Sequence, residues 1–289
     1  MQRRGVIPCQ QGKRFIMKPL FSTLFLTVLL LPALAQKQWE LRLLGGYDFS
    51  TASQYRLSQD IITTGSSTSR AVNTSLGRGV QIGGDVTWWT NRYFGIMAGA
   101  GWLVTTPTVK GSSSYGMIDY SYSSSETWRS QLALTTAGIA LKIPDTKLSP
   151  YARMGLLLPV YSHLTSKADW GSTSIAGSTN GKSETAFKLR STAGYTAALG
   201  IAPRLDKLVS VFAEIHLQSL AILARHSELT SYSVKGVDQL GSYNTYFREV
   251  DYVKKISDYT YDADKPQKQL IFSFPYSSIG IHAGIIVKL

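Results

Sequence analysis

The sequence predicts an all-β fold, an antiparallel up-and-down β-barrel. Three observations support this prediction: apolar and small or polar residues alternate with a period of two in eight segments, the connections between these segments are alternately short and long, and the faces that are not apolar consist mainly of Gly, Ala, Ser and Thr. Alternation with this period places one set of side chains on each face of a strand. Eight such strands are enough to close a small barrel.

Both faces can be identified in each expected strand. The strands lie near residues 39–49, 78–89, 93–106, 127–143, 151–162, 187–205, 208–219 and 279–289. The last one is the clearest, with Ile279, Ile281 and Ile285 on one face and Gly280 and His282 on the other. Its length matches a β-strand that crosses a bilayer at a tilt, for which roughly 9–11 residues are needed.

The segment near 127–143 departs from simple alternation. Arg129 and Gln131 share the parity of Ile139 and Leu141, so we expect a β-bulge there that exchanges the two faces. That bulge, or a small extra strand in the last long connection, leaves the strand count open between eight and ten.

The order of the connections distinguishes the two ends of the barrel. The short ones lie near 90–92, 144–149 and 205–207, and the long ones near 50–77, 107–126, 163–186 and 220–274. Short periplasmic turns on one rim and long extracellular loops on the other are typical of an outer-membrane barrel. Both ends of the barrel domain are then expected on the short-turn, periplasmic side.

The composition of the two faces indicates which one is turned outward. A soluble barrel normally carries Lys and Glu on its outer face, whereas small residues suit the crowded interior of an eight-stranded barrel. We therefore expect the apolar faces to contact lipid. Trp39 and Phe49 lie on one apolar face, and their separation of about 25 Å along a tilted strand equals the height of a membrane barrel's apolar band. A soluble secreted barrel that binds apolar ligands is an alternative, and it predicts extraction without detergent.

The N-terminal residues have the features of an export signal. A basic start at Lys18, an apolar run over 20–31 and the small-x-small pattern Ala33-Leu34-Ala35 predict a signal peptide at 17–35, with cleavage between Ala35 and Gln36. Residues 1–16 are expected to be an upstream extension and 36–289 the barrel domain. The only cysteine, Cys9, precedes the cleavage point, so thiol chemistry is not expected in the mature chain.

Cleavage also changes the charge of the chain. Five of its 30 basic residues and none of its 18 acidic ones precede Gln36, so 25 basic and 18 acidic residues remain and the formal net charge falls from +12 to +7. The remaining basic residues are scattered along an exported chain, so nucleic acid is not an expected partner. Anionic lipid headgroups are the expected partners of these basic residues.

Four stretches carry a resemblance to a known family. They are SPYARMGLLLPV at 149–160, YTAALGIAPRL at 195–205, VSVFAEIHLQSL at 209–220 and SSIGIHAGIIVKL at 277–289. In these the chain resembles the outer-membrane β-barrel domain proteins of Gram-negative bacteria, often called porin-family proteins, and in architecture the small eight-stranded barrels. The resemblance implies an outer-membrane location, contact with outer-membrane lipids, insertion by the barrel-insertion machinery and a monomer.

Seven ionisable residues are expected to project into the lumen: Arg42, Asp85, Arg129, Arg153, Arg204, Glu214 and His216. Charges in so narrow a space must pair to offset their desolvation. We expect a structural salt-bridge network that fills the barrel. A narrow gated ion path through the same network is the alternative.

Catalytic and ligand sites are less clearly indicated. His226-Ser227-Glu228, and less well Ser162-His163, have the residue types of a lipid-modifying hydrolase, but neighbouring residues of a strand point to opposite faces, so we assign no catalytic residue. No metal-ligand cluster or phosphate loop is recognised, and we expect no cofactor.

The last long connection, 220–274, is rich in tyrosine and in acidic residues. Exposed tyrosines suit recognition of a surface ligand, whereas the simpler interpretation is that they pack this segment onto the rim of the barrel. Asp258, Asp262 and Asp264 indicate calcium only weakly, because their spacing matches no standard loop.

Overall fold

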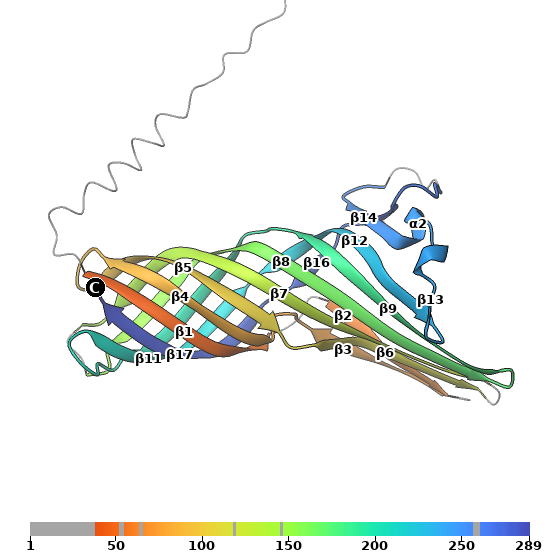
Figure 1. Ribbon diagram of the computed structural model, residues 1–289. Helices are drawn as coiled ribbons and strands as arrows, with labels where there is room; N and C mark the ends of the chain where they lie inside the picture. Colours follow the sequence, from red (N-terminus) through yellow and green to blue (C-terminus); the bar gives the residue numbers. More distant parts are fainter. Residues whose placement is uncertain (1–37, 52–54, 64–65, 118–119, 145–146, 257–260) are drawn as a thin grey trace, which may run out of the picture. The chain divides into compact units, whose positions relative to one another are not determined.

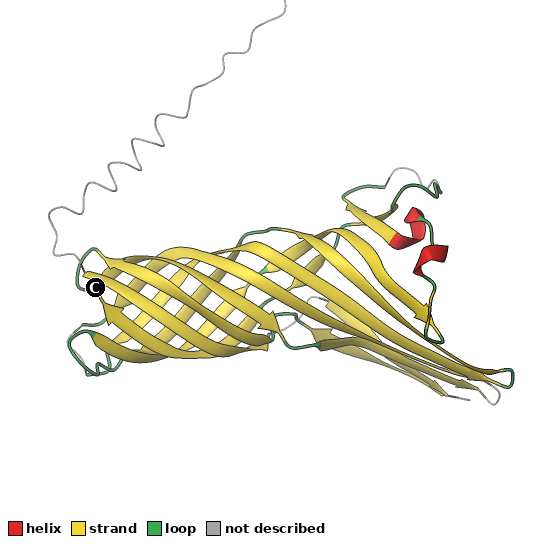
Figure 2. Ribbon diagram, in the orientation of Figure 1, coloured by secondary structure: helices red, strands yellow, loops and turns green. Residues whose placement is uncertain are grey.

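The computed structural model describes residues 38–51, 55–63, 66–117, 120–144, 147–256 and 261–289. Within them, seventeen strands form one continuous sheet (Figures 1 and 2). The strands are β1 Gln38–Ser50, β2 Tyr55–Thr63, β3 Ser66–Thr74, β4 Gly79–Trp89, β5 Phe94–Thr105, β6 Thr108–Met117, β7 Tyr120–Lys142, β8 Pro150–Ser174, β9 Gly177–Arg190, β10 Gly194–Ile201, β11 Val209–Ser219, β12 Ala221–Val234, β13 Val237–Asp238, β14 Glu249–Val253, β15 Gln267–Leu270, β16 Ser273–Pro275 and β17 Ser278–Lys288. The helical turns are η2 Leu240–Ser242 and α2 Thr245–Arg248. No helix in the described ranges is long and apolar enough to cross a membrane.

Eight of the strands close into a ring. Antiparallel pairing runs β1–β4–β5–β7–β8–β10–β11–β17 and returns to β1. The closing pair aligns Leu43 with Ile285 in β17, and on its other side β1 aligns Arg42 with Asp85 in β4. Each ring strand corresponds to one of the eight segments expected from the alternation, so the predicted barrel and its count of eight are confirmed.

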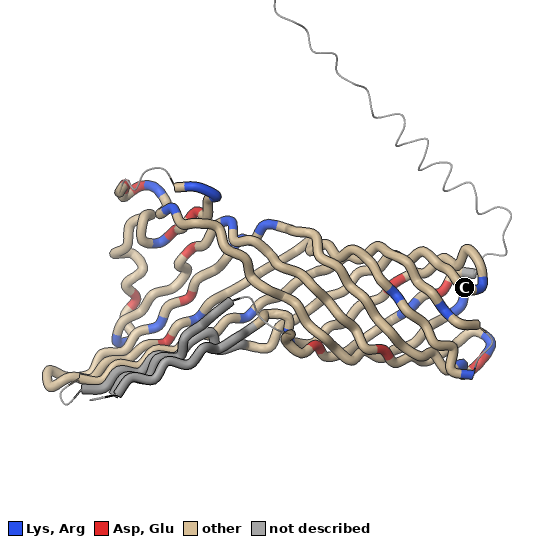
Figure 3. The backbone as a smooth tube through the Cα atoms, turned by 180° about the vertical axis from the view of Figure 1, so that it is seen from behind, with Lys and Arg blue, Asp and Glu red and all other residues tan. Residues whose placement is uncertain are grey.

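The apolar faces of the ring point outward. Leu156, Leu199 and Ile281 are 63%, 68% and 65% exposed, although they belong to the middle of well-paired strands. The opposite faces carry Gly, Ala and buried polar side chains. Figure 3 shows long stretches of the barrel strands without any charged residue.

Much of the long connections expected as loops is paired strand. β2 and β3 form a hairpin within 50–77, β6 pairs with the first half of β7, and β8, which is 25 residues long, pairs with β9 from Leu164 onward. The expectation that these connections are loops is therefore corrected. Their sequences are rich in Ser and Thr, and antiparallel pairing of backbone groups does not require an apolar face, so the hydrophobic signal fades where the strands continue.

The expected strand near 187–205 is interrupted. β9 ends at Arg190 and β10 begins at Gly194, and the partner of β8 changes from β10 at Leu157 to β9 at Leu164. β11 and β12 are likewise two consecutive strands along one extended segment, because β11 ends at Ser219 and β12 begins at Ala221. The barrel wall and the extension beyond it are thus built from successive parts of the same strands.

The bulge expected in the strand near 127–143 lies on its neighbour. β7 pairs with β5 without a shift from Leu141 to Gln131, and buried and exposed residues keep one parity along it. The register shift occurs in the β7–β8 pairing, where Ala133 faces Tyr161 and Leu134 faces Pro159. Proline has no N–H to donate to the neighbouring strand. The extra, unpaired residue of the bulge therefore lies on β8, next to Pro159.

Candidate functional site in the barrel lumen

The lumen contains three layers of side chains, which follow one another from the short-turn end to the hairpin end. The first is an ionic lattice, defined as Arg42, Asp85, Arg153 and Glu214. The second is a histidine layer, defined as Asp48, His216 and His282. The third is an apolar plug where the ring strands give way to the hairpins. The order follows from the registers, since β1 runs from Arg42 to Asp48 along the barrel and Asp48 pairs with Gly280.

The ionic lattice joins four strands through two arginines and two carboxylates. Arg153 lies 2.5 Å from an oxygen of Asp85 and 2.6 Å from one of Glu214, and Arg42 lies 3.0 Å from the other oxygen of Glu214. All four side chains are less than a tenth exposed. Two positive and two negative charges balance within the lattice, which offsets the cost of burying them.

Aromatic rings enclose the lattice on the short-turn side. The Tyr151 hydroxyl donates to Glu214 at 2.8 Å, and the Arg42 guanidinium lies 4.5 Å and 4.6 Å from the ring centres of Tyr151 and Phe212. Arginine stacks favourably on such faces. The rings hold the guanidinium in place, and Arg42 and Tyr151 also line the opening at the short-turn end.

A basic cavity of about 250 Å³ lies at the short-turn end. Lys142 contacts Glu40 at 2.9 Å and lies 3.7 Å from the ring centre of Trp89, while Arg204 and Lys288 line the same cavity. Arg204 was expected inside the lumen. It is exposed in the turn after β10 and belongs to this opening, not to the lattice.

Arg129 is a second departure. It is exposed and shares the outward parity of Leu141, whereas its neighbours Trp128 and Ser130 are buried. Its predicted position in the lumen was wrong because the prediction assumed an exchange of faces along this strand that does not occur. Arg42, Asp85, Arg153, Glu214 and His216, in contrast, all lie in the lumen.

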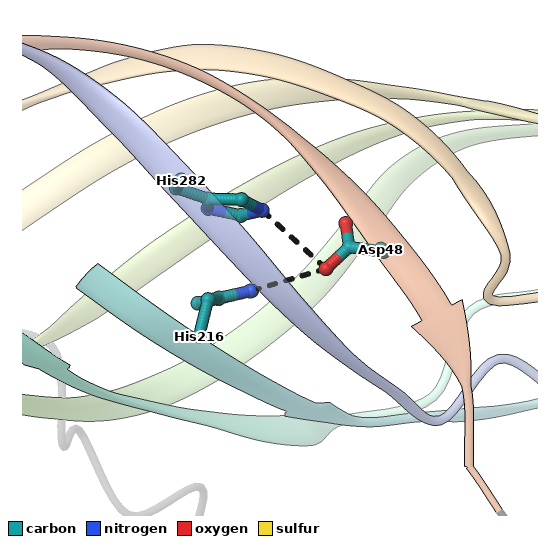
Figure 4. A group of neighbouring side chains, drawn as sticks. All are labelled: Asp48, His216 and His282. Carbon is teal, nitrogen blue, oxygen red and sulfur yellow. Dashed lines mark ion pairs between the residues drawn. The ribbon is translucent and has the colours of Figure 1, made fainter. Parts of the chain in front are cut away.

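The histidine layer brings together residues distant in the sequence (Figure 4). Nδ1 of His216 and Nε2 of His282 lie 3.6 Å and 3.4 Å from the same oxygen of Asp48, and the two rings stack at 4.4 Å. Only His216 was singled out from the sequence. Asp48 and His282 share the lumen parity of Arg42 and Glu214, and the register of β1, β11 and β17 was the missing information.

The apolar plug fills the lumen at the hairpin end. Tyr276 lies at its centre without solvent exposure, and its hydroxyl is 2.8 Å from the Ser130 hydroxyl. The plug as a whole consists of Leu76, Leu103, Trp128, Leu132, Leu134, Leu157, Leu164, Phe187, Leu220, Ile222, Ala224, Phe274 and Tyr276. These residues are buried on the inward faces and remove apolar surface from water at this end.

The residues considered for hydrolysis do not form a nucleophile–base pair. His226 Nδ1 lies 2.8 Å from Asp251, whereas the Ser227 hydroxyl is 3.1 Å from the Tyr252 hydroxyl on the other face of the strand. His163 is exposed and contacts Thr165 at 3.1 Å. The alternation of side chains along β12 therefore separates Ser227 from His226.

The tyrosines of 220–274 pack largely against one another. Tyr246 and Tyr261 are 4.8 Å apart and Tyr232 and Tyr243 5.1 Å apart, each pair edge to face. Asp258 lies outside the described residues. Lys265, which lies 2.7 Å from Asp262, lowers the pKa of that exposed carboxyl group, so the acidic side chain already has a cationic partner.

No protein-family model and no curated protein matches the chain. Among solved structures, it is similar to Ail, the attachment invasion locus protein of Yersinia pestis, at 9% identity and a TM-score of 0.30, covering 87% of this chain and 99% of that one. It is also similar to Acinetobacter baumannii CarO2, at 12% identity and a TM-score of 0.31, covering 88% of this chain and all of that one. The eight-stranded ring with an apolar exterior is the architecture of a small outer-membrane barrel.

Proposed function

We propose that this chain is a non-enzymatic integral protein of the outer membrane, whose barrel is closed to solutes and whose hairpin extensions mediate contacts at the cell surface. The observation that carries the proposal is the sequence of layers inside the ring. A lumen that holds a balanced ionic lattice, buried histidines and an apolar plug is suited to structure rather than to transport. The apolar exterior of the same ring suits contact with lipid.

The narrow gated channel is the nearest alternative, and conductance separates the two. The mature chain, folded in detergent and inserted in planar bilayers, is expected to give no sustained channel events. Heat-modifiable mobility of the same preparation serves as the control for folding and insertion. Stable conductance of the unmodified protein would refute the closed barrel.

Membrane integration is tested independently of conduction. We expect the protein to remain with the outer-membrane fraction, to require detergent for release and to migrate differently in gels before and after heating. Release by salt alone, with no change of mobility on heating, would support the soluble barrel instead.

The paired strands that continue beyond the ring are proposed as contact sites because of their length. β8 continues well beyond the roughly 9–11 residues that a membrane crossing requires, and the tyrosine-rich segment follows β12 on the same side of the barrel (Figure 1). Exposed aromatic side chains such as Phe247 and Tyr261, 58% and 59% exposed, suit contact with a surface ligand. Replacing both by Ser is expected to reduce binding to cells or matrix components while heat-modifiable mobility is unchanged.

A further inference from the structure

We propose that Asp48, His216 and His282 form a buried binding site for a divalent transition-metal ion such as Zn²⁺. Three strands of the ring supply these ligands, β1, β11 and β17, and the site lies between the ionic lattice and the apolar plug. Their three ligand atoms lie within 4.8 Å of one another, and the side chains are at most 8% exposed. Imidazole nitrogen and carboxylate oxygen are common ligands of Zn²⁺.

The hydrogen bonds of His216 leave a lone pair facing the carboxylate. The Thr196 hydroxyl donates to the Leu217 carbonyl at 3.2 Å and lies 2.7 Å from Nε2 of His216. When the hydroxyl gives its one proton to the carbonyl, it accepts the N–H at Nε2. In that tautomer of neutral His216, Nδ1 has no hydrogen and faces an Asp48 oxygen across 3.6 Å. Two electron-rich atoms in this position favour a cation between them.

The distances fit shared coordination better than direct hydrogen bonds. Among the described residues, both oxygens of Asp48, both ring nitrogens of His282 and Nδ1 of His216 have no hydrogen-bond partner. An N–H···O bond in a protein spans about 2.7–3.2 Å. Two ligand atoms on one tetrahedral Zn²⁺, each about 2.0–2.1 Å from the metal, are about 3.3–3.4 Å apart. The observed separations of 3.4 Å and 3.6 Å lie close to that value.

Charge balance also favours a cation at this point. The ionic lattice contains equal numbers of positive and negative groups, so it leaves no countercharge for Asp48, which is fully buried. A carboxylate in such surroundings is costly unless a positive group compensates it. A metal ion coordinated by two neutral imidazoles and this carboxylate supplies the missing charge.

The second nitrogen of His216 contacts a group that can orient the ring. Nε2 of His216 lies 2.7 Å from the Thr196 hydroxyl, whereas Nδ1 of His282 lies 3.9 Å from an oxygen of Glu214, which is beyond hydrogen-bond distance. A hydrogen bond like that of His216 is usual for histidines that bind metals, since it fixes the tautomer and the ring plane. Glu214 also belongs to the ionic lattice, so the proposed site adjoins the lattice.

The backbone makes room for the three side chains. A Cβ added to Gly280 would overlap the Oδ1 atom of Asp48, and one added to Gly46 would overlap the ring of His282. A cavity of about 50 Å³, lined by both histidines, adjoins the site. It is large enough for a few water molecules, one of which can complete a four-coordinate shell.

Zinc content of the folded protein tests this proposal. The mature chain is folded in detergent with excess Zn²⁺, so that a buried site is accessible during folding, then dialysed and analysed for metal. We expect about one Zn²⁺ per chain, and Co²⁺ in its place should give the visible absorption of a tetrahedral complex. H216Q and H282Q are expected to retain less than a tenth of this zinc, and Thr196→Val to weaken binding about 10–100-fold.

Two controls make the result decisive. His226→Gln removes a histidine that pairs with Asp251 outside the lumen and should leave the zinc content unchanged, and heat-modifiable mobility shows whether each variant is folded. Folded wild-type protein with less than about a tenth of an equivalent of zinc would overturn the proposal, and protonated histidines would then be the partners of Asp48. Zinc retained in folded H216Q and H282Q would overturn it equally.

Discussion

Replacement of Arg153 by Leu should destabilise the barrel more than any exposed ion pair can. Arg153 makes the two shortest contacts of the ionic lattice, at 2.5 Å and 2.6 Å. Without it, Asp85 retains Arg42 at 3.9 Å and the Thr87 hydroxyl at 3.4 Å, and the lattice changes from neutral to a net charge of −1. Removal of one partner from a buried ion pair costs about 3–5 kcal/mol, because the other charge stays buried.

The assay is equilibrium unfolding in urea, followed by tryptophan fluorescence of the protein in lipid vesicles. With a slope of ~2 kcal/mol per M, the midpoint should fall by about 2 M. Arg153→Leu combined with Asp85→Leu restores neutrality and should cost less than the sum of the two single variants. As a matched control, Lys182→Leu breaks the exposed pair with Asp169 and should change the free energy of unfolding by less than about 1 kcal/mol. A loss below about 1 kcal/mol for Arg153→Leu, or additive effects in the double variant, would refute the reasoning.

Three further predictions concern the plug, the barrel closure and the sidedness. Tyr276→Phe removes one buried hydroxyl bond to Ser130 and should cost about 0.5–1.5 kcal/mol in the same urea assay; an unchanged midpoint would contradict the role of that bond. Gly284→Val places side-chain atoms against the Leu43 carbonyl and should abolish the heat-modifiable form, so a normally shifted band would show that the seam tolerates the bulk. Ala176→Cys in the β8–β9 turn should react with an impermeant maleimide on intact cells, whereas Asn91→Cys in a short turn should react only after lysis, and the reverse pattern would invert the proposed orientation.

The ring was predictable because one physical signal marks each of its strands. Wherever a strand has lipid on one side and a crowded lumen on the other, the two faces must differ in every second residue, as in 279–289. Lumen residues such as Arg42 and Glu214 could be placed by parity alone. Arg129 follows the same parity and lies outside with Leu141; it was misplaced because a β-bulge was assumed on this strand that lies on β8.

Contacts between strands that are distant in the sequence were not predictable. Asp48, His216 and His282 meet only because β1 and β11 flank β17 in a particular register, and a shift of two residues would separate them while the alternation stayed the same. The apolar plug was missed for a related reason. Its leucines and aromatic rings face inward, where an apolar residue was taken as a sign of lipid contact.

The order of the three lumen layers makes the two ends of the barrel interior different. The apolar plug occupies the hairpin end with buried side chains, whereas the basic cavity reaches Arg42 and Tyr151 from the short-turn end. In the closed barrel that we propose, small ions and protons reach the buried polar groups from the short-turn end. The hairpins on the far side can change in sequence and length without altering the chemical environment of the lattice beneath them.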